Sequence, residues 1–157
     1  MSQAIGARRG RGFTLVELLT VVAVIAVIAA IAAPGMRSFA ATQRVKSLAY
    51  DLTADLLLAR SEALKRNTSV TIAKTGSTWG SGWAVASGAD NISTRNAIDA
   101  ALTFGSAPTS ITFDVNGRSA AQVRMSVSSP DATSDTSKRC IELDLSGRAK
   151  SKVGLCP

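Results

Sequence analysis

The sequence of 157 residues contains no histidine and only two cysteines. Without histidine, Ser-His-Asp and Cys-His nucleophilic systems are excluded, and so are metal sites with imidazole ligands. Two cysteines alone leave a tetrahedral zinc site two ligands short. The sequence also lacks a Gly-x-x-x-x-Gly-Lys-Ser/Thr phosphate loop, and its glycines show no dinucleotide-binding spacing. We therefore expect a protein that is not an enzyme and that holds no cofactor and no metal.

Aromatic residues are scarce as well, at 4% of the chain. Beyond its N-terminal region the chain is rich in Ser, Thr, Ala and Gly, so we expect a thin core made mostly of Val, Ile and Leu. About 120 residues are available for this core, which is enough for one modest domain and not for two. No internal repeat is visible.

One long apolar segment stands out from this polar background. It runs from Phe13 to Ala33, a stretch of 21 residues in which Glu17 is the only charged residue, and it stops at Pro34. A helix of this length is roughly 32 Å long, close to the thickness of the hydrocarbon core of a bilayer. The segment is therefore predicted to be a transmembrane helix.

Glu17 is the unusual residue of the apolar segment. A carboxylate in apolar surroundings costs about 2.5–3.5 kcal/mol on insertion scales, so we expect it to have a partner. Breaking a buried ion pair leaves one charge uncompensated, so loss of such a partner would be costly. The alternative is a glutamate near the membrane interface that reaches water.

Basic residues precede the apolar segment. Three arginines lie within residues 8–11, with no acid among them, and Gly12 separates them from Phe13. Such charges keep the flanking end of a membrane helix on the cytoplasmic side. A secretory signal peptide is an alternative, because residues 32–33 are small, but its apolar segment spans only about 7–15 residues. A plain membrane anchor is a second alternative, but it gives no reason for an acid at position 17.

Beyond Pro34, an amphipathic helix is predicted over residues 36–66, ending near Asn67, because apolar residues recur at intervals of three and four. Its apolar positions are Phe39, Val45, Leu48, Leu52, Leu56, Ala59 and Ala63. With the apolar segment it would form one bent helix of about 80 Å. Asp51 and Asp55 could pair on this helix, but two solvated charges are the favoured interpretation.

After Asn67 the apolar period changes to two, which indicates short strands. They are predicted over residues 69–73, 83–86, 110–115, 122–127 and 140–145. Asn116-Gly117 is expected to be the turn of a hairpin that joins the third of these strands to the fourth. Residues 90–101 are expected to form a loop with a short helical turn. Residues 128–137 are polar and are expected to be mobile.

The C-terminal segment is the second informative feature. Arg148, Lys150 and Lys152 alternate with small residues, and in an extended strand they would project from one face about 6–7 Å apart, a spacing that suits successive phosphates. Further cations expected nearby are Lys138, Arg139 and Arg118. No aromatic residue is interleaved, which favours sequence-independent phosphate contact over base stacking. The alternative is a solvated edge strand, whose lysines block unwanted pairing.

Cys140 and Cys156 both lie outside the apolar segment. In an oxidising compartment we expect them to form a disulfide, with two partly buried free thiols as the alternative. The closed loop of about 15 residues corresponds to about 3 kcal/mol in the chain-entropy description. The bridge would pin the basic segment beside Lys138 and Arg139, and it would lower the entropy cost of binding.

The basic leader, Gly12, Phe13, Glu17 and Pro34 together resemble the class III signal of type IV pilins and pseudopilins. The resemblance implies that a prepilin peptidase cuts between Gly12 and Phe13 and then methylates the new amino terminus. It also implies that Glu17 pairs with the freed ammonium group of Phe13, usually on a neighbouring subunit, and so sets the axial register. The partners implied are other pilin or pseudopilin subunits.

The segment from Ile111 to Arg118 and the basic tail that ends in Cys156 resemble the FimT/GspH minor pilin family. This resemblance implies a type IV pilin-like α+β fold, in which a long bent N-terminal helix packs on a small antiparallel β-sheet domain. The implied parts are a cleaved leader of residues 1–12, a transmembrane and assembly helix of residues 13–33, and a periplasmic domain of residues 34–157. The chain would span the inner membrane once.

Two functions are compatible with this resemblance. FimT-like members are implicated in type IV pili and DNA uptake through a basic tail, whose matching positions are Arg148, Lys150 and Lys152. Lys150 supplies a point charge but not the bidentate fork of an arginine. We expect a minor pilin that binds extracellular DNA for natural transformation. The alternative is a purely structural minor pilin, or the H-type pseudopilin of a type II secretion system, that primes fibre assembly.

Overall fold

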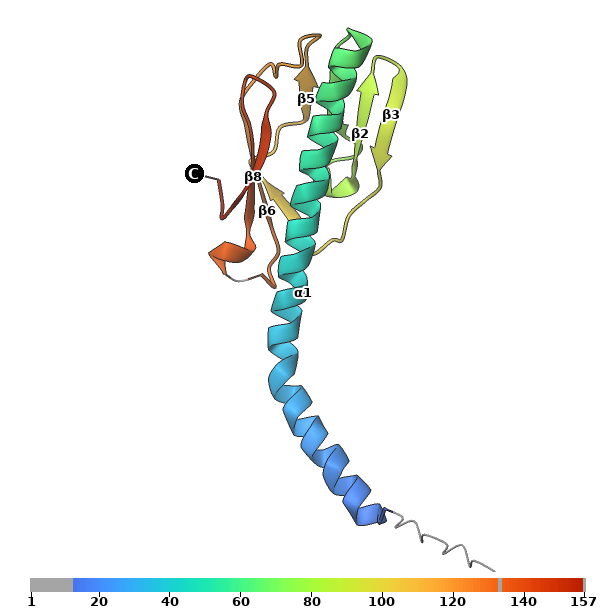
Figure 1. Cartoon of the computed structure of the whole chain (residues 1–157), viewed down its shortest axis with the longest axis vertical. Helices are drawn as coiled ribbons and strands as arrows, with labels where there is room; N and C mark the ends of the chain where they lie inside the picture. Colours follow the sequence, from blue (N-terminus) through green and yellow to red (C-terminus); the bar gives the residue numbers. More distant parts are fainter. Residues whose placement is uncertain (1–12, 133, 157) are drawn as a thin grey trace, which may run out of the picture. The chain divides into compact units, whose positions relative to one another are not determined.

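A computed structural model of the chain describes residues 13–132 and 134–156. In this part of the chain, one long helix, α1 (Leu15–Arg66), is followed by short strands and two 3-10 turns (Figure 1). The strands are β1 (Val70–Lys74), β2 (Trp83–Ser87), β3 (Asp90–Arg95), β4 (Thr103–Gly105), β5 (Ser110–Phe113), β6 (Val123–Ser128), β7 (Arg139–Leu143) and β8 (Ala149–Val153). The 3-10 turns are η1 (Trp79–Ser81) and η2 (Asp135–Ser137). The predicted leader of residues 1–12, with Gly12, lies outside the described residues.

The chain divides into two compact units, Met1–Met36 and Arg37–Pro157. In the first unit, the hydroxyl of Thr14 accepts the backbone N–H of Glu17 at 3.2 Å and so caps the start of α1. An 18-residue window of α1 near the N-terminus has a mean hydropathy of 2.8, and none of it is buried, so by length and composition this helix can cross a membrane. Pro34 lies inside α1, so the predicted apolar and amphipathic helices belong to one continuous element.

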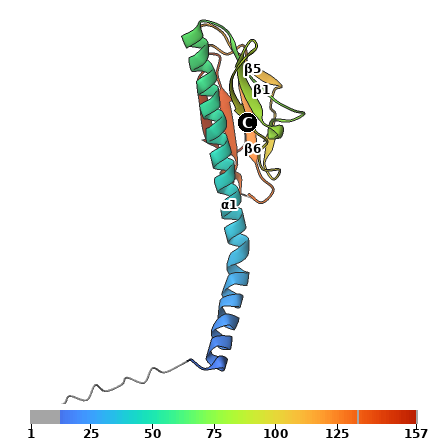
Figure 2. The same ribbon diagram turned by 90° about the vertical axis from the view of Figure 1, so that its right-hand side faces the viewer.

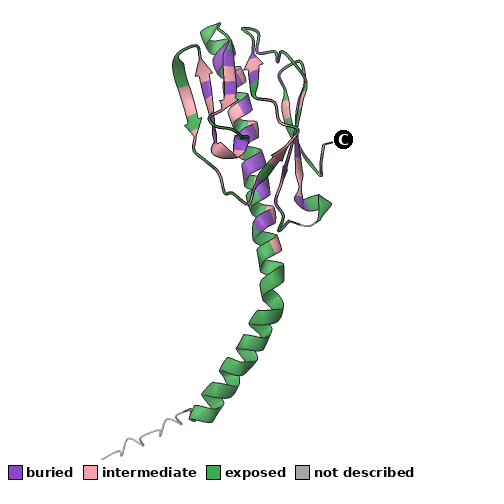
Figure 3. Cartoon of the chain, turned by 180° about the vertical axis from the view of Figure 1, so that it is seen from behind, coloured by how far each residue is buried: buried purple, intermediate pink, exposed green. Residues whose placement is uncertain are grey.

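In the second unit, one face of α1 is buried, and Figure 3 shows how the buried residues follow that face. Six of the seven apolar positions predicted for this helix are buried, from Val45 to Ala63. Phe39 is the exception, because it is 60% exposed, and Ala41 takes its place in the core. Ala41 is four residues before Val45 and continues the three-and-four spacing, whereas Phe39 is six residues away and points elsewhere.

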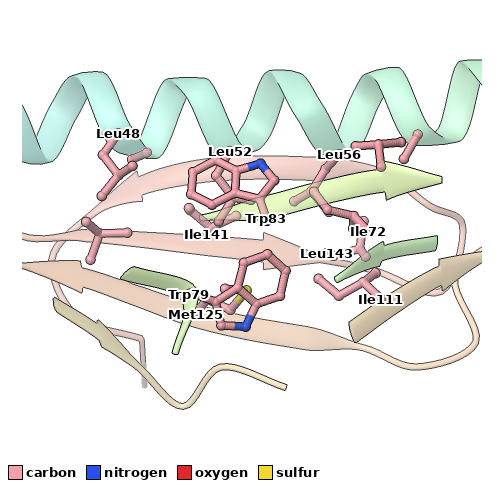
Figure 4. Packing of buried hydrophobic residues seen from close by; sticks show 14 of the residues in the cluster. Leu48, Leu52, Leu56, Ile72, Trp79, Trp83, Ile111, Met125, Ile141 and Leu143 are labelled. Atoms are coloured by element: carbon pink, nitrogen blue, oxygen red, sulfur yellow. The ribbon is translucent and has the colours of Figure 1, made fainter. Parts of the chain in front are cut away.

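Two four-stranded antiparallel sheets cover the buried face of α1 (Figures 1 and 2). The first sheet has the order β3-β2-β1-β5 and the second the order β4-β6-β7-β8. Alternate strand residues point inward, as a period of two requires. They are Val70, Ile72, Trp83, Val85, Ile111, Phe113, Met125, Val127, Ile141 and Leu143. Figure 4 shows Leu48, Leu52 and Leu56 of α1 over side chains from both sheets, among them Ile72 and Ile141, so both sheets share one core.

Aromatic side chains contribute more to this core than the sequence predicted. Most buried residues are aliphatic, but Trp79 and Trp83 are only 2% and 1% exposed, and their ring centroids lie 6.1 Å apart. Phe104 lies 6.3 Å and 6.2 Å from the two indole rings. The indole N–H of Trp83 donates to Asp55 at 2.8 Å, and that of Trp79 donates to the carbonyl of Pro108 at 2.5 Å. Both buried polar groups are therefore satisfied.

The expectation of a loop with a helical turn over residues 90–101 is wrong, because β3 occupies the first half of that segment. β3 pairs with β2 through a two-residue turn in which Gly88 has a φ of 59°. Its last residue, Arg95, lies 3.4 Å from both Asp51 and Asp55 of α1, and its guanidinium stacks 5.7 Å above the ring of Trp83. Both aspartates therefore pair with Arg95, and the expectation that they are two simply solvated charges is wrong. These long-range contacts stabilise a polar edge strand that its own sequence does not indicate.

The predicted hairpin between residues 110–115 and 122–127 is also wrong. β5 pairs with β1 in the first sheet, whereas β6 pairs with β4 and β7 in the second. A tight turn does follow β5, but the returning chain makes only the single bridge between Phe113 and Ser119. The N–H of Ser119 then donates to the carbonyl of Leu145 at 3.3 Å, so the chain is diverted to the second sheet.

Two turns of the same design lie against each other at this point. Residues 114–118 and residues 144–148 both have the sequence Asp-x-x-Gly-Arg, a short repeat that was not predicted to have a structural role. In each turn the aspartate side chain accepts the arginine N–H, at 2.8 and 3.1 Å, and the aspartate carbonyl accepts the glycine N–H, at 2.8 and 2.9 Å. A Cβ atom placed on Gly147 would lie 2.0 Å from the carbonyl oxygen of Gly117. We call this pair the twin turns.

Of the other elements expected from the sequence, three strands are confirmed, whereas one strand and one packed segment were not predicted. The predicted strands over residues 69–73, 83–86 and 140–145 correspond to β1, β2 and β7. β4 was not anticipated, because three residues are too few to show a period. Within residues 128–137, expected to be a polar mobile segment, Ser129, Ala132 and Ser137 are buried, so this segment packs against the domain.

The contact between the twin turns predicts that Gly147→Ala is strongly destabilising. Gly147 has a φ of 77°, so alanine there is strained and also overlaps the Gly117 carbonyl. We expect a loss of more than about 3 kcal/mol in the free energy of unfolding. Gly88→Ala is the matched control, because Gly88 has a φ of 59° but nothing within 4 Å, and strain alone costs about 1–2 kcal/mol. Denaturant unfolding followed by tryptophan fluorescence measures both, and equal losses would contradict the packing argument.

The end of α1 carries an acid-sensitive ion pair. Glu62 accepts Nε–H of Arg66 at 2.6 Å and Nζ–H of Lys65 at 3.3 Å, and the hydrogen bond from Arg66 is the main cause that holds its pKa below the ordinary value of 4.5. Because the folded-state pKa is lowered, this carboxylate stabilises the fold above pH 4.5, and its contribution is lost as the pH falls through the folded-state pKa.

We therefore expect Glu62→Gln to lower stability at neutral pH and to flatten the fall in stability between about pH 5 and pH 3. Denaturant unfolding at a series of pH values measures both effects. Asp131→Asn, which removes an exposed carboxylate, serves as the control. If the free energy of unfolding of Glu62→Gln falls with decreasing pH as steeply as that of the unaltered protein, the assignment to Glu62 is wrong.

Candidate functional site

The N-terminal unit presents an apolar helix with no cover. Its large apolar side chains are exposed along the whole described part, which begins with Phe13 (80% exposed) and in which Ile31 is 77% exposed. Glu17 is exposed in the first turn of α1, where the positive end of the helix dipole favours an acid. An uncovered apolar surface of this extent calls for lipid or for other helices around it.

The C-terminal residues form an extended edge strand, which is the conformation that the one-sided arrangement of Arg148, Lys150 and Lys152 required. β8 pairs only with β7 in the second sheet, with Leu143 opposite Ala149 and Arg139 opposite Val153. Lys150 and Lys152 are exposed, whereas the intervening Ser151 is half-buried. The two lysines therefore project from the same outward face, one strand period apart.

A disulfide fastens the chain that follows β8. Cys140 of β7 is bonded to Cys156 with a Cα–Cα distance of 4.9 Å, which confirms the predicted pairing. The N–H of Gly154 also donates to the carbonyl of Lys138 at 2.9 Å. The basic strand is thus held at both ends, by the twin turns before it and by the bridge after it.

The six cations proposed from the sequence form a row rather than one cluster. Arg118 and Arg148 end the two twin turns, so they lie at one end of the β7–β8 pair, and both are exposed. Lys150 and Lys152 follow along β8, whereas Lys138 and Arg139 lie at the opposite end of the pair. Because each strand residue advances about 3.3 Å, the row extends over roughly 17 Å from position 148 to position 153.

The two cations at the far end of the row are less available than expected. Lys138 donates to Asp135 at 2.8 Å, and its side chain is only 24% exposed. Arg139 is half-buried, and its Nε atom is buried without a hydrogen-bond partner among the described residues. The expected gathering of cations beside the disulfide is therefore only partly realised, and the exposed cations of the row are Arg118, Arg148, Lys150 and Lys152.

Sequence reasoning missed one residue of this surface, Glu142. It lies on β7 opposite both Arg124 of β6 and Lys150 of β8, and its carboxylate accepts Nζ–H of Lys152 at 2.5 Å. The hydrogen bond from Lys152 is the main cause that lowers the pKa of Glu142, so this carboxylate stays ionised at neutral pH. The alternation Ile-Glu-Leu in β7 was the available signal, because it places Glu142 on the outward face.

The described residues include no group of three or more His, Cys, Asp or Glu side chains arranged to hold a metal ion. Cys140 and Cys156 are taken up by the disulfide. The C-terminal region therefore presents a charged surface on a strand that is fixed at both ends.

Comparison with known proteins agrees with the fold and the N-terminal motif. The profile of the family described as Type II transport protein GspH matches residues 48–147, and that of the prokaryotic N-terminal methylation motif matches residues 7–33. The type IV minor pilin FimU of Pseudomonas aeruginosa (strain PAO1) has a similar fold in two crystal forms. The first has a TM-score of 0.60 at 24% identity, over 70% of this chain and 89% of FimU. The second has a TM-score of 0.57 at 23% identity, over 68% and 91%.

No curated protein sequence matches the chain. The likeness to FimU, at this identity, shows the pilin-type fold of one long helix on antiparallel sheets, as predicted. The GspH profile covers most of the chain, and the methylation motif covers the whole apolar segment of residues 13–33. The members of this family are structural subunits and not enzymes. The chain therefore belongs to the GspH family of pilin-like subunits, and its N-terminal segment carries the prokaryotic methylation motif.

Proposed function

We propose that this chain is a minor pilin of a type IV pilus that binds extracellular DNA without regard to sequence, for use in natural transformation. The observation that carries the proposal is the fixed, extended row of Arg148, Lys150 and Lys152. A strand held by the twin turns and by the disulfide loses little conformational entropy on binding, which favours affinity.

The composition of the surface indicates what kind of contact it makes with DNA. Both tryptophans are buried in the core, and the outward face of β8 carries only lysines. Bases therefore have no aromatic surface there on which to stack, and contact with phosphates is favoured. Each contact is weak, but many subunits along a fibre would bind one DNA molecule with higher avidity.

The N-terminal part of the proposal concerns processing and assembly. A prepilin peptidase would cut between Gly12 and Phe13, and residues 13–33 would then hold the mature chain in the inner membrane with the remaining domain in the periplasm. Pairing of Glu17 with the ammonium group of Phe13 on a neighbouring subunit would offset the desolvation of both charges. The match to the N-terminal methylation motif supports this order of events.

A second candidate function is the H-type pseudopilin of a type II secretion system, or a minor pilin with a purely structural role. The description of the matching family as a type II transport protein favours it. It requires the same anchor and the same assembly contact, but it assigns no ligand to the basic strand. DNA binding therefore separates the two candidates.

The DNA-binding proposal predicts the behaviour of the triple variant Arg148→Gln, Lys150→Gln, Lys152→Gln. We expect the unaltered chain, in nonionic detergent, to bind duplex DNA in the micromolar range or more weakly at low salt. The variant should lose most of this affinity, and its salt dependence should be shallower by up to about three in the slope of log K against log salt.

The matched control removes three cations from α1, as Arg37→Gln, Arg44→Gln and Lys46→Gln. It has the same net charge as the triple variant but an unaltered basic strand. Equal loss of binding in both variants would show that overall charge is responsible. Absence of binding by the unaltered chain at low salt would favour the purely structural role.

The assembly proposal predicts that Glu17→Gln is processed normally but does not enter fibres efficiently. The amide cannot pair with the ammonium group, so that charge stays uncompensated in apolar surroundings. Mass spectrometry of the membrane fraction measures cleavage, and immunoblotting of sheared fibres measures incorporation. Glu17→Asp, which keeps the charge on a shorter side chain, should restore part of the incorporation. Incorporation of Glu17→Gln at the unaltered level would contradict the role of the pair.

A further inference from the structure

One carboxylate lies in the middle of the basic outward face of the second sheet. Glu142 of β7 has Arg124 opposite it on one side and Lys150 opposite it on the other, and it binds Lys152 at 2.5 Å. The side chain of Glu142 is 22% exposed and that of Lys152 is 58% exposed, so the pair lies at the surface and is accessible. Three cations from the two neighbouring strands, β6 and β8, therefore surround one anion on this face.

The position of Glu142 has a direct effect on the cations of β8. A lysine that binds a carboxylate presents less net charge to any other anion. In this structure the contact engages Lys152, whereas Lys150 and Arg148 make no ion pair with a described residue. The pKa of Glu142 is held below its ordinary value of 4.5, chiefly by the hydrogen bond from Lys152, so the carboxylate remains charged at neutral pH.

We propose that Glu142 competes with DNA for Lys152, because its carboxylate takes the place that a backbone phosphate would occupy beside this lysine. Glu142 thereby sets the affinity of β8 for DNA, and it sets the shortest DNA that binds. This inference rests on the proposed DNA binding, and it names the residue that regulates the same surface.

The competition has a physical consequence for ligand size. An intramolecular carboxylate acts at a high effective concentration, in the millimolar range or above, so a single phosphate does not displace it efficiently. A longer polyanion can contact Arg148 and Lys150 first, and its next phosphate then competes with Glu142 from within the complex. The surface should therefore discriminate against inorganic phosphate and mononucleotides in favour of long strands.

The test is the binding of labelled duplex DNA of about 12 and about 30 base pairs by the full chain in nonionic detergent. We expect Glu142→Gln to bind both duplexes about threefold to fivefold more tightly at low salt, with the larger gain for the shorter duplex. Glu142→Thr, which keeps a good strand residue at this position, should show the same gain. Thermal unfolding of each variant shows that the domain remains folded.

Two further variants make the test specific. Asp99→Asn removes one negative charge and one surface ion pair, that of Asp99 with Arg44 at 2.8 Å, and it should change affinity less than twofold. In the double variant Glu142→Gln, Lys152→Gln the affinity should return to about that of the unaltered chain, because the gain passes through Lys152.

The possible outcomes separate this inference from the proposed function. If the unaltered chain binds DNA through Arg148, Lys150 and Lys152, but Glu142→Gln binds no more tightly than Asp99→Asn, the inference is wrong and the proposed function stands. A gain that survives removal of Lys152 also overturns it. If neither the unaltered chain nor Glu142→Gln binds DNA at low salt, both the inference and the proposed function are wrong.

Discussion

The fold of the second unit depends on the buried face of α1. No strand of the first sheet pairs with a strand of the second in the described residues, so no ladder of strand hydrogen bonds joins the two sheets into one. The stripe of aliphatic residues from Val45 to Ala63 lies against both, and it completes a single core. Burial of this face, rather than strand pairing, therefore holds the basic strand and the rest of the domain in one body.

This arrangement explains why the sequence was informative about some elements and not about others. A period of three and four, or of two, reflects burial on one face, and α1, β1, β2 and β7 all bury a face deeply. β3 buries almost nothing and depends on Arg95, whose partners Asp51 and Asp55 lie some 40 residues away in the chain. The false hairpin has the same cause, since a turn sequence fixes the local bend but not which sheet the next strand joins.

The candidate site was predictable in its composition but not in its electrostatics. Alternation was enough to place Lys150 and Lys152 on one face, and two cysteines in the whole chain left one possible pairing. The pairing of β7 with β8 was needed to show that Glu142 lies among these cations, and η2 was needed to show that Asp135 engages Lys138. Net charge along a sequence therefore overestimates the charge that a folded surface presents.

The twin turns constrain how this chain can vary. Because Gly147 lies directly against the carbonyl of Gly117, the two loops must keep the same length and the same backbone path. An insertion in either loop would separate the surfaces that now touch, and only a compensating change in the other loop could restore the contact. Residues 114–118 and residues 144–148, although some 30 positions apart, should therefore evolve as one unit, whereas loops with no such neighbour remain open to insertion.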